Sequence, residues 1–310
     1  MIFRYEYEGG VWVDLELPSE DEIRQVVREF SISERIGTEL LSPTPVPLVA
    51  GDLCTALLVL HFPVPRTDDN ESRSQEIDFI VGDHFIVTVR YELVTSLHHL
   101  KKLLETELAV DGSATVSTDA LLEILFAHVY TSVRDHINHS ASQLAHVERE
   151  MFDGRERQTI HAISDVSREF LHLEATLVNH EEPLMRFLKT LGERNFFGPS
   201  FNDRLARIMA ERAHVAHLVH TYRAVTTELR ETNMAVLETR QNDIMKTLTL
   251  ITVIVLPLEL VAVTLGIHAP GTPLVIEEGS NAFWIIIAIM LAVVACMTIF
   301  FTRKRWFVGV

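Results

Sequence analysis

The chain has 310 residues, with 27 Lys and Arg against 43 Asp and Glu, which gives a formal net charge of −16. This acidic balance argues against a nucleic-acid partner, because phosphate binding needs clustered basic side chains. The negative charge could attract cations to the protein, or it could equally well only keep the protein soluble. Hydrophobic residues make up 47% of the chain and are concentrated near its C-terminus, which indicates a polar body attached to a membrane segment.

Residues 1–115 are predicted to form an α+β domain. Val11–Leu17 alternates like a strand, and Ser19 with Glu22 makes a capping box that opens a short helix. Three further runs rich in Val, Ile and Phe are typical of strands, the last two joined at Gly82-Asp83 as a hairpin: Leu53–Phe62, Glu76–Gly82 and His84–Glu92. The first residues lack the basic and apolar segments of a signal peptide, so we expect this domain to stay in the cytoplasm.

Residues 116–246 are predicted to form a helical stalk. The expected helices run from Ser117 to about Phe152, from Glu156 to about Leu191 with an interruption at Pro183, and from Asn202 to Gly266. Gly154 separates the first two helices, and a turn at Asn195–Ser200 separates the second from the third. The third helix would be on the order of 100 Å long at 1.5 Å per residue. Such a length favours coiled-coil-like packing against the preceding helices and neighbouring subunits.

Two apolar runs near the C-terminus are long enough to cross a membrane. Thr247–Ile267 carries a single charge, Glu259, and Ala282–Phe301 carries none. Each run has about 20 residues, which cover roughly the 30 Å hydrocarbon core of a bilayer. We assign residues 247–268 and 282–302 to two transmembrane helices. Residues 269–281 between them are so few that the two spans must form an antiparallel hairpin.

The basic residues near the two spans predict their orientation. They lie at the ends away from the link: Arg240, Lys246, Arg303, Lys304 and Arg305. The link itself has no Lys or Arg, so the positive-inside rule puts both termini in the cytoplasm and the link outside. We therefore expect a multi-pass protein of the inner (plasma) membrane, in contact with lipid, with residues 303–310 as a basic cytosolic tail.

Several segments resemble the CorA magnesium transporter family. The segment QNDIMKTLTLITVIVLPLELVAVTLGIH, the second span and the TRKRW ending carry the resemblance, and VWVDLELPSEDEI and GDHFIVTVR are similar to the family's cytosolic domain. The resemblance covers the whole chain in order. It implies a homopentamer with a funnel-shaped cytosolic domain and a central pore lined by the first span. It also implies influx of Mg²⁺, with Co²⁺ or Ni²⁺ as passengers, or of Zn²⁺ in the ZntB branch, and neither an enzymatic activity nor a cofactor.

The triplet at the outer end of the first span departs from the family's pattern. The family has Gly-Met-Asn there, or Gly-Ile-Asn or Gly-Val-Asn in the zinc branch, whereas this chain has Gly266, Ile267 and His268. The Asn oxygen of the family suits hydrated Mg²⁺, which gives up its water reluctantly. An imidazole nitrogen is a better match for Zn²⁺, Ni²⁺ or Co²⁺. His268 could equally be an interfacial residue that donates hydrogen bonds to water, so the identity of the ion stays open.

Side chains spaced four and three residues apart keep to one face of the first span. The face contains Glu238, Asn242, Met245, Thr249, Thr252, Leu256, Glu259, Val263 and Gly266. Such a stripe on its own usually indicates helix packing, but the resemblance places Asn242, Met245 and Leu256 at pore-lining and constricting positions, with Leu248 at a further constriction. We expect Asn242, Thr249 and Thr252 to offer oxygens to the ion, and Met245 and Leu256 to narrow the path.

Acidic residues lie within the first span and in the link. A carboxylate in a span costs several kcal/mol unless it meets water, a cation or a partner. Glu259 therefore indicates a ring of carboxylates that binds the cation, partly protonated because like charges repel, or else a structural hydrogen bond to a neighbouring helix. Glu277 and Glu278 either concentrate cations at the outer mouth or are solvated loop charges.

The chain has 15 histidines, some at helical spacing. His136 and His139 form one pair three residues apart, and His214, His217 and His220 form a series. A third ligand from another helix would make either group a Zn²⁺ site, with a regulatory role in the cytosol. The sequence shows no HExxH motif, nucleophile triad, phosphate loop or dinucleotide motif. A non-conducting membrane sensor or scaffold is the alternative to a transporter, and a membrane-anchored metallohydrolase a more distant one.

Overall fold

The computed structural model describes residues 2–64, 74–111, 116–194, 197–198, 200–266 and 282–303. The chain divides into two compact units, Met1–Glu231 and Thr232–Val310. The first unit contains the sheet and the helices packed on it, together with the beginning of a very long helix. The predicted division at residue 115 falls within the first unit, between the part of the chain that contains the sheet and the long helices that follow it, and it stays a prediction.

A six-stranded sheet forms the centre of the first unit, with the order β1-β2-β6-β5-β4-β3. The strands are β1 Ile2–Tyr7, β2 Gly10–Glu16, β3 Leu48–Gly51, β4 Ala56–Pro63, β5 Ser74–Val81 and β6 Phe85–Arg90. All neighbouring strands are antiparallel except β2 and β6, which run parallel. The predicted hairpin is confirmed, because the Gly82 amide donates to the Phe85 carbonyl at 3.0 Å. The edge strands β1 and β3 were not predicted.

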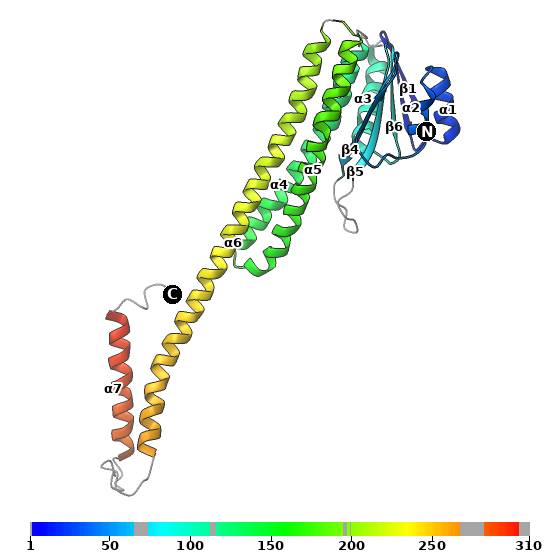
Figure 1. The fold of residues 1–310 in the computed structure, drawn as a ribbon. Coiled ribbons are helices and arrows are strands. Elements are labelled where there is room, and N and C mark those ends of the chain that lie inside the picture. Colours follow the sequence, from blue (N-terminus) through cyan, green and yellow to red (C-terminus); the bar gives the residue numbers. More distant parts are fainter. Residues whose placement is uncertain are drawn as a thin grey trace. The chain divides into compact units, whose positions relative to one another are not determined.

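Helices cover both faces of this sheet (Figure 1). On one face lie α1 Glu20–Glu29 and α2 Glu34–Glu39, and on the other α3 Thr95–Asp111, α4 Thr118–Phe152 and α5 Glu156–Glu193. Successive side chains of a strand point to opposite faces. Leu57 of β4 accordingly belongs to the core beneath α1, and Leu58 to the core beneath α4 and α5. The capping box of α1 is confirmed, since the Ser19 amide donates to Glu22 at 2.8 Å and the Glu22 amide donates to Ser19 at 3.3 Å.

The helix boundaries agree with the predicted ones, apart from one correction. Helix α4 ends at Phe152, just before Gly154, whose φ of +95° suits a residue without a side chain. Helix α5 continues through Pro183, so the predicted interruption is wrong. Proline lacks the N–H that would bond the carbonyl of Asn179. The helix continues because Leu184 beyond the proline is fully buried, and its burial offsets the lost bond.

Helix α6, Phe201–Gly266, is a single helix of 66 residues with Pro257 in its interior, as predicted. Ion pairs and a hydrogen bond join the N-terminal part of α6 to α4 and α5. Arg204 contacts Asp119 at 2.7 Å and Glu123 at 2.8 Å. Further along the helix, Arg212 donates to the carbonyl of Leu177 at 2.7 Å. These contacts come from both α4 and α5, so they fix the direction in which α6 leaves the domain.

A buried ion pair joins the two parallel strands of the sheet. The Arg90 guanidinium donates to Asp14 at 2.7 Å and to Glu16 at 2.9 Å, and its side chain has no exposed surface. Thr88 donates to the same Asp14 carboxylate at 2.7 Å, and the Trp12 indole donates to Thr88 at 3.0 Å. Buried charges are tolerated only when they are paired and hydrogen-bonded. This network therefore specifies the pairing of β2 with β6.

We predict that Asp14→Ala lowers the free energy of unfolding by about 3–5 kcal/mol, because it leaves the Arg90 charge buried with one carboxylate instead of two. Arg24→Gln serves as the matched control, since Arg24 pairs with Glu20 on the exposed surface of α1. Its loss should cost no more than about 0.5 kcal/mol. Denaturant unfolding of the full chain, followed by tryptophan fluorescence, measures both. Equal costs for the two variants would contradict the role of the buried pair.

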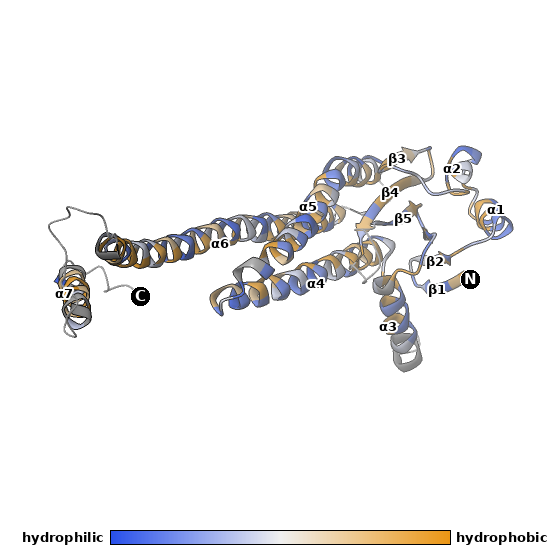
Figure 2. Ribbon diagram, turned by 90° about the horizontal axis from the view of Figure 1, so that it is seen from below, coloured by the Kyte–Doolittle hydropathy of each residue, from blue (hydrophilic) through white to orange (hydrophobic). Residues whose placement is uncertain are grey.

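The second unit contains the C-terminal part of α6 and helix α7, Ala282–Arg303. In both ribbon views α7 lies beside the end of α6 (Figures 1 and 2), and in the hydropathy colours of Figure 2 orange apolar residues are visible on both helices. Among the described residues, α6 is the helix long and apolar enough to cross a membrane, and only 6% of its 18-residue apolar window is buried. A shorter apolar stretch, Ile287–Ile299, lies in α7.

Candidate ion path along α6

The predicted stripe of side chains is exposed along the C-terminal part of α6. Its apolar members have more than half of their surface exposed: Met245 54%, Leu248 56%, Leu256 60% and Val263 56%. Its polar members are exposed as well: Glu238, Asn242, Thr249, Thr252 and Glu259. Gly266 is the last residue of the helix. The structure thus places the described members of the stripe on one continuous helix, without cover from their own chain.

The opposite side of the same helix is partly covered. Leu250 is 9% exposed, and Ile254, Pro257 and Val261 are partly buried. These residues follow one another at steps of four, three and four, so they share one face. At roughly 100° per residue, this face lies about 140° around the helix from Met245, Leu256 and Val263. Helix α7 lies beside the end of α6 in both ribbon views (Figures 1 and 2). The partly buried face and the exposed stripe are therefore different sides of α6.

The threonines of the stripe use their hydroxyl protons within the helix. Thr249 donates to the Met245 carbonyl at 2.7 Å, and Thr252 donates to the Leu248 carbonyl at 2.9 Å. Each hydroxyl oxygen therefore keeps lone pairs and has no proton to offer outward. A lone pair can accept from a water molecule in the shell of a hydrated cation or bind the cation itself. Neither threonine offers a donor to an anion.

Glu259 is an exposed carboxylate within the apolar part of α6. It has no hydrogen bond or ion pair with any residue in the described part of the chain. A charge in such a stretch must find water, a cation or another subunit, because hydrocarbon cannot solvate it. Its side chain is exposed, so the described part of its own chain does not supply the structural partner suggested by the sequence.

A shallow cavity lies beside the beginning of the stripe. It is lined by Asn242, Met245 and Thr249, as predicted, and also by Thr239, Asp243 and Lys246. Asp243 and Lys246 form an ion pair at 3.2 Å. The prediction left these two residues out because they lie one step off the four-and-three spacing. Their charges would have pointed to a polar end of the stripe.

The candidate histidines do not gather into one site. His136 is buried, with Nε2 at 2.8 Å from Glu169, so it joins α4 to α5, whereas His139 is exposed. His214, His217 and His220 are exposed on α6, and His220 lies 3.5 Å from Glu174. Within the described ranges, no three His, Cys, Asp or Glu side chains are close enough together to hold a metal ion. The regulatory metal sites stay a prediction.

Several predicted residues lie outside the described part of the chain. These are Ile267 and His268 of the terminal triplet, Glu277 and Glu278 of the link, and Lys304 and Arg305 of the tail. Arg303 is the last residue of α7, and its side chain is exposed.

A sheet domain joined by long helices to an apolar, mostly uncovered helix defines a membrane protein with a large polar domain. The sequence model of the "CorA-like Mg2+ transporter protein" family matches residues 7–305. The chain therefore belongs to this family of divalent-cation transporters.

Similar proteins agree with this assignment. The chain is 19% identical over 307 residues to the cobalt/magnesium transport protein CorA of Methanocaldococcus jannaschii, a match that covers 96% of this chain and 91% of the relative. The complete structure of the CorA magnesium transporter from that organism superposes with a TM-score of 0.74 at 18% identity, covering 98% of this chain and 93% of the other. The ZntB cytoplasmic domain from Vibrio parahaemolyticus gives 0.60 at 10% identity, covering 76% and 90%. Both structural matches establish the fold.

Proposed function

We propose that five copies of the chain surround a central pore lined by α6, through which divalent cations cross the inner (plasma) membrane. The observation that carries this proposal is the exposed stripe from Asn242 to Val263, which includes Glu259, a carboxylate with no hydrogen bond or ion pair among the described residues. A stripe of amide, hydroxyl and carboxylate oxygens would be costly against lipid. Around a shared axis it lines a path for a hydrated cation.

The membrane topology follows from the two apolar helices and the charges around them. Residues 247–268 and 282–302 form an antiparallel hairpin, and residues 269–281 lie outside. Arg240, Lys246 and the basic residues at 303–305 remain in the cytoplasm with both termini. The sheet domain and stalk then form a funnel at the cytoplasmic end of the pore, with acidic groups that attract cations.

Each part of the stripe has a distinct role in this proposal. The side-chain oxygen of Asn242 accepts hydrogen bonds from the water shell of the ion at the cytoplasmic end of the pore. The hydroxyl oxygens of Thr249 and Thr252 accept hydrogen bonds from this water in the middle of the pore. Met245, Leu248 and Leu256 narrow the path and exclude water when it closes. Glu259 provides a ring of carboxylates that holds the cation close to the outer mouth, where His268 completes the triplet.

The transported ion is Mg²⁺, Zn²⁺, Co²⁺ or Ni²⁺. The relatives named above are a cobalt/magnesium transport protein and a ZntB protein. Mg²⁺ prefers oxygen ligands and keeps its water, whereas the other three accept imidazole nitrogen. The His268 of this chain therefore favours a transition metal over Mg²⁺.

Cysteine accessibility tests the orientation of α6. In a background without Cys54 and Cys296, we predict that a charged, water-soluble thiol reagent modifies Leu256→Cys at least about ten times faster than Ile254→Cys. The thiolate is the reactive form, and each unit by which an apolar environment raises the thiol pKa lowers the thiolate fraction about tenfold. Equal rates at the two positions, with transport retained, would mean that the stripe does not face water.

Replacing the carboxylate of the stripe tests the ion path itself. We predict that Glu259→Gln lowers divalent-cation uptake into proteoliposomes at least about fivefold, because a unit charge about 4 Å from a cation is worth about 1 kcal/mol even in water.

Glu228→Gln is the matched control, since it removes an exposed carboxylate from α6 outside the apolar span. An unchanged uptake rate for Glu259→Gln would remove the carboxylate ring from the proposal. A wild-type chain that gave no metal-dependent dye signal above leak, for any of the four metals, would identify it as a non-conducting sensor or scaffold.

Restoring asparagine at the triplet tests the choice of ion. We predict that His268→Asn raises Mg²⁺ uptake relative to Ni²⁺ or Zn²⁺ uptake by roughly tenfold, about 1.4 kcal/mol, because an amide oxygen replaces an imidazole nitrogen. Uptake of each metal, measured at two pH values, gives the ratio. His268→Gln, which also carries an amide but is longer, controls for the loss of the imidazole alone. An unchanged ratio of Mg²⁺ uptake to Ni²⁺ or Zn²⁺ uptake in both variants would show that His268 has no role in the choice of ion.

A further inference from the structure

Residues 40–47, the strap, connect α2 to β3 and are attached to the sheet through the backbone of one residue. The Thr44 amide donates to the two carboxylate oxygens of Glu76, at 2.7 and 3.0 Å, and the Thr44 carbonyl accepts from His61 Nε2 at 2.8 Å. Pro43 and Pro45, on either side of Thr44, have no N–H to donate, and their rings restrict the backbone. The strap is therefore a stiff segment whose middle is held to the sheet by His61 and Glu76.

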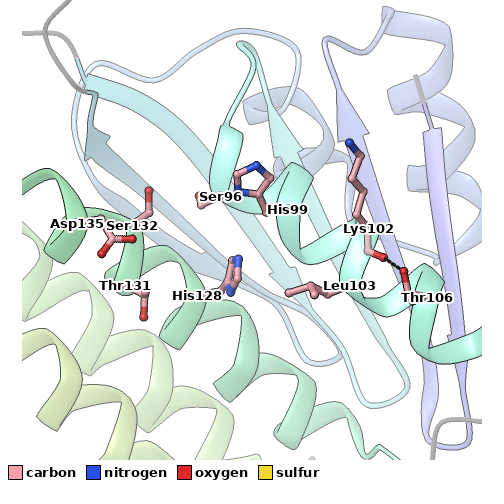
Figure 3. Close-up of a pocket in the computed structure, with 9 residues that line it drawn as sticks. All are labelled: Ser96, His99, Lys102, Leu103, Thr106, His128, Thr131, Ser132 and Asp135. Carbon is pink, nitrogen blue, oxygen red and sulfur yellow. Dashed lines mark hydrogen bonds between the residues drawn. The ribbon is translucent and has the colours of Figure 1, made fainter.

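These two side chains stand next to each other on the sheet. His61 of β4 and Glu76 of β5 are directly paired in the strand register, and His61 Nε2 lies 3.6 Å from Glu76 Oε2. Asp78, two residues further along β5, points to the same face as Glu76. Ile77 and Phe79 point to the other face, into the core beneath α4 and α5. The groove between α3 and α4 (Figure 3) also lies on that other face, so it is separate from this cluster.

The contacts of Tyr91 are both satisfied only if Asp78 carries a proton. The Tyr91 hydroxyl oxygen lies 3.0 Å from the carbonyl oxygen of Leu40 in the strap and 3.0 Å from Asp78 Oδ2. A hydroxyl has one proton, and a carbonyl can only accept it. Both contacts are hydrogen bonds when the hydroxyl donates to Leu40 and accepts from a protonated Asp78. The Asp78 side chain is only 1% exposed, and burial favours the neutral carboxyl as well.

The surroundings of Asp78 and His61 make both groups hold their protons in the folded chain. Burial and the charge of Glu76 raise the pKa of Asp78 well above its usual value, and the charge of Glu39 in α2 adds to this effect. The hydrogen bond with Glu76 raises the pKa of His61, although burial opposes this shift, and the Thr44 carbonyl raises it further. A group with a raised pKa stabilises the folded form at low pH, and this stabilisation is lost as the pH rises. For His61 the loss begins above about pH 6.5.

We propose that the strap is a pH-sensitive switch, which is closed on the sheet while Asp78 and His61 hold their protons and opens as the pH rises. Deprotonation of Asp78 places a second carboxylate beside Glu76 in a buried cluster, and deprotonation of His61 removes the charge that balances Glu76. The two carboxylates repel each other, and they regain water when the strap leaves the sheet. In the proposed topology the strap lies in the cytoplasm, so it responds to the pH there.

The sheet beneath the strap keeps its own attachment when the strap opens. On the other face, the His61 carbonyl accepts from His180 Nε2 of α5 at 2.7 Å, and the Tyr130 hydroxyl of α4 lies 3.3 Å from His180 Nδ1. Burial lowers the pKa of His180 to about 4, and the nearby charge of Arg212 acts in the same direction. The His180 imidazole therefore stays neutral over the pH range in which His61 loses its proton. Opening is thus confined to the strap.

Hydrogen–deuterium exchange of the full chain in detergent tests the switch, because the Thr44 and Val46 amides lie within the strap. Exchange rates are divided into the intrinsic rate at each pH to give protection factors. We expect the protection factor of the strap to fall at least about fivefold between about pH 6 and about pH 8.5, because each pKa unit lost on opening is worth tenfold in the equilibrium. The protection factors of β4 should stay constant over the same range.

Substitutions separate the proton from the fold. Asp78→Asn replaces the protonated carboxyl by an amide that can still donate, so at about pH 8.5 the strap should be protected at least about fivefold more than in the wild type. Combining it with His61→Gln should remove the dependence on pH altogether. His84→Gln is the matched control, since His84 pairs with Asp83 at 3.3 Å on the exposed surface of the same sheet. It should keep the response of the wild type.

Wild-type protection of the strap that does not fall relative to β4 as the pH rises would overturn the switch. A double variant that loses protection with pH as the wild type does would overturn it as well. The wild-type comparison of the strap with β4 decides the question even if a variant fails to fold. Glu259→Gln should leave the response of the strap intact, so a failure of the ion path and a failure of the switch are distinguishable.

Discussion

A peptide backbone that enters hydrocarbon must bond to itself, because lipid offers no partner for its N–H and C=O groups. Helix α6 satisfies this constraint over 66 residues without a break. Since the helix is continuous, its period decides which side chains share a face, from the ion pairs of Arg204 to the carboxylate of Glu259. Pro257 removes one backbone bond, but it does so on the partly buried face of the helix. The need for backbone hydrogen bonds keeps α6 helical, and the helical period then determines which residues lie on the partly buried face and which lie on the stripe.

The two units differ in how much of their apolar surface is buried by their own chain. In the first unit, both faces of the sheet are covered by helices of the same chain, and even charged groups such as Asp14 and Arg90 are paired inside. In the second, Leu248, Leu256 and Val263 remain more than half exposed. The described part of a single copy does not cover them. In the proposed assembly, lipid and other copies of the chain supply this cover, so the second unit depends on its surroundings more than the first.

Local sequence signals predicted much of the fold. The capping box at Ser19, the start of α4 and the hairpin at Gly82 each depend on residues close together in the chain, and all were found. The edge strand β3 was missed because its four residues are too few to show a period, and β1 was missed because Arg4 and Glu6 interrupt its apolar residues at the start of the chain. The break at Pro183 was predicted because proline lacks a backbone N–H. The helix nevertheless continues, because the burial of Leu184 offsets the lost hydrogen bond.

The candidate ion path was predicted only in part from the sequence, and its role stays a prediction. Helical spacing placed the residues from Asn242 to Val263 on one face, because a straight helix needs no tertiary information, and the resemblance to the family gave that face its role as a pore lining. Which face of α6 would be partly buried could not be read from the sequence, since apolar residues occur on every face of both spans.

The hydrogen bonds of Thr249 and Thr252 to their own helix have an electrostatic consequence. Both hydroxyl groups donate their only proton to a backbone carbonyl, so the lone pairs of each oxygen, the negative end of the hydroxyl dipole, point away from the helix. Together with the carboxylate of Glu259, this makes a surface that attracts positive ions and repels chloride without a single fixed charge at the threonines. In the proposed pore, the sign of the ion that crosses would then depend on the direction of these two dipoles as well as on the charge of Glu259.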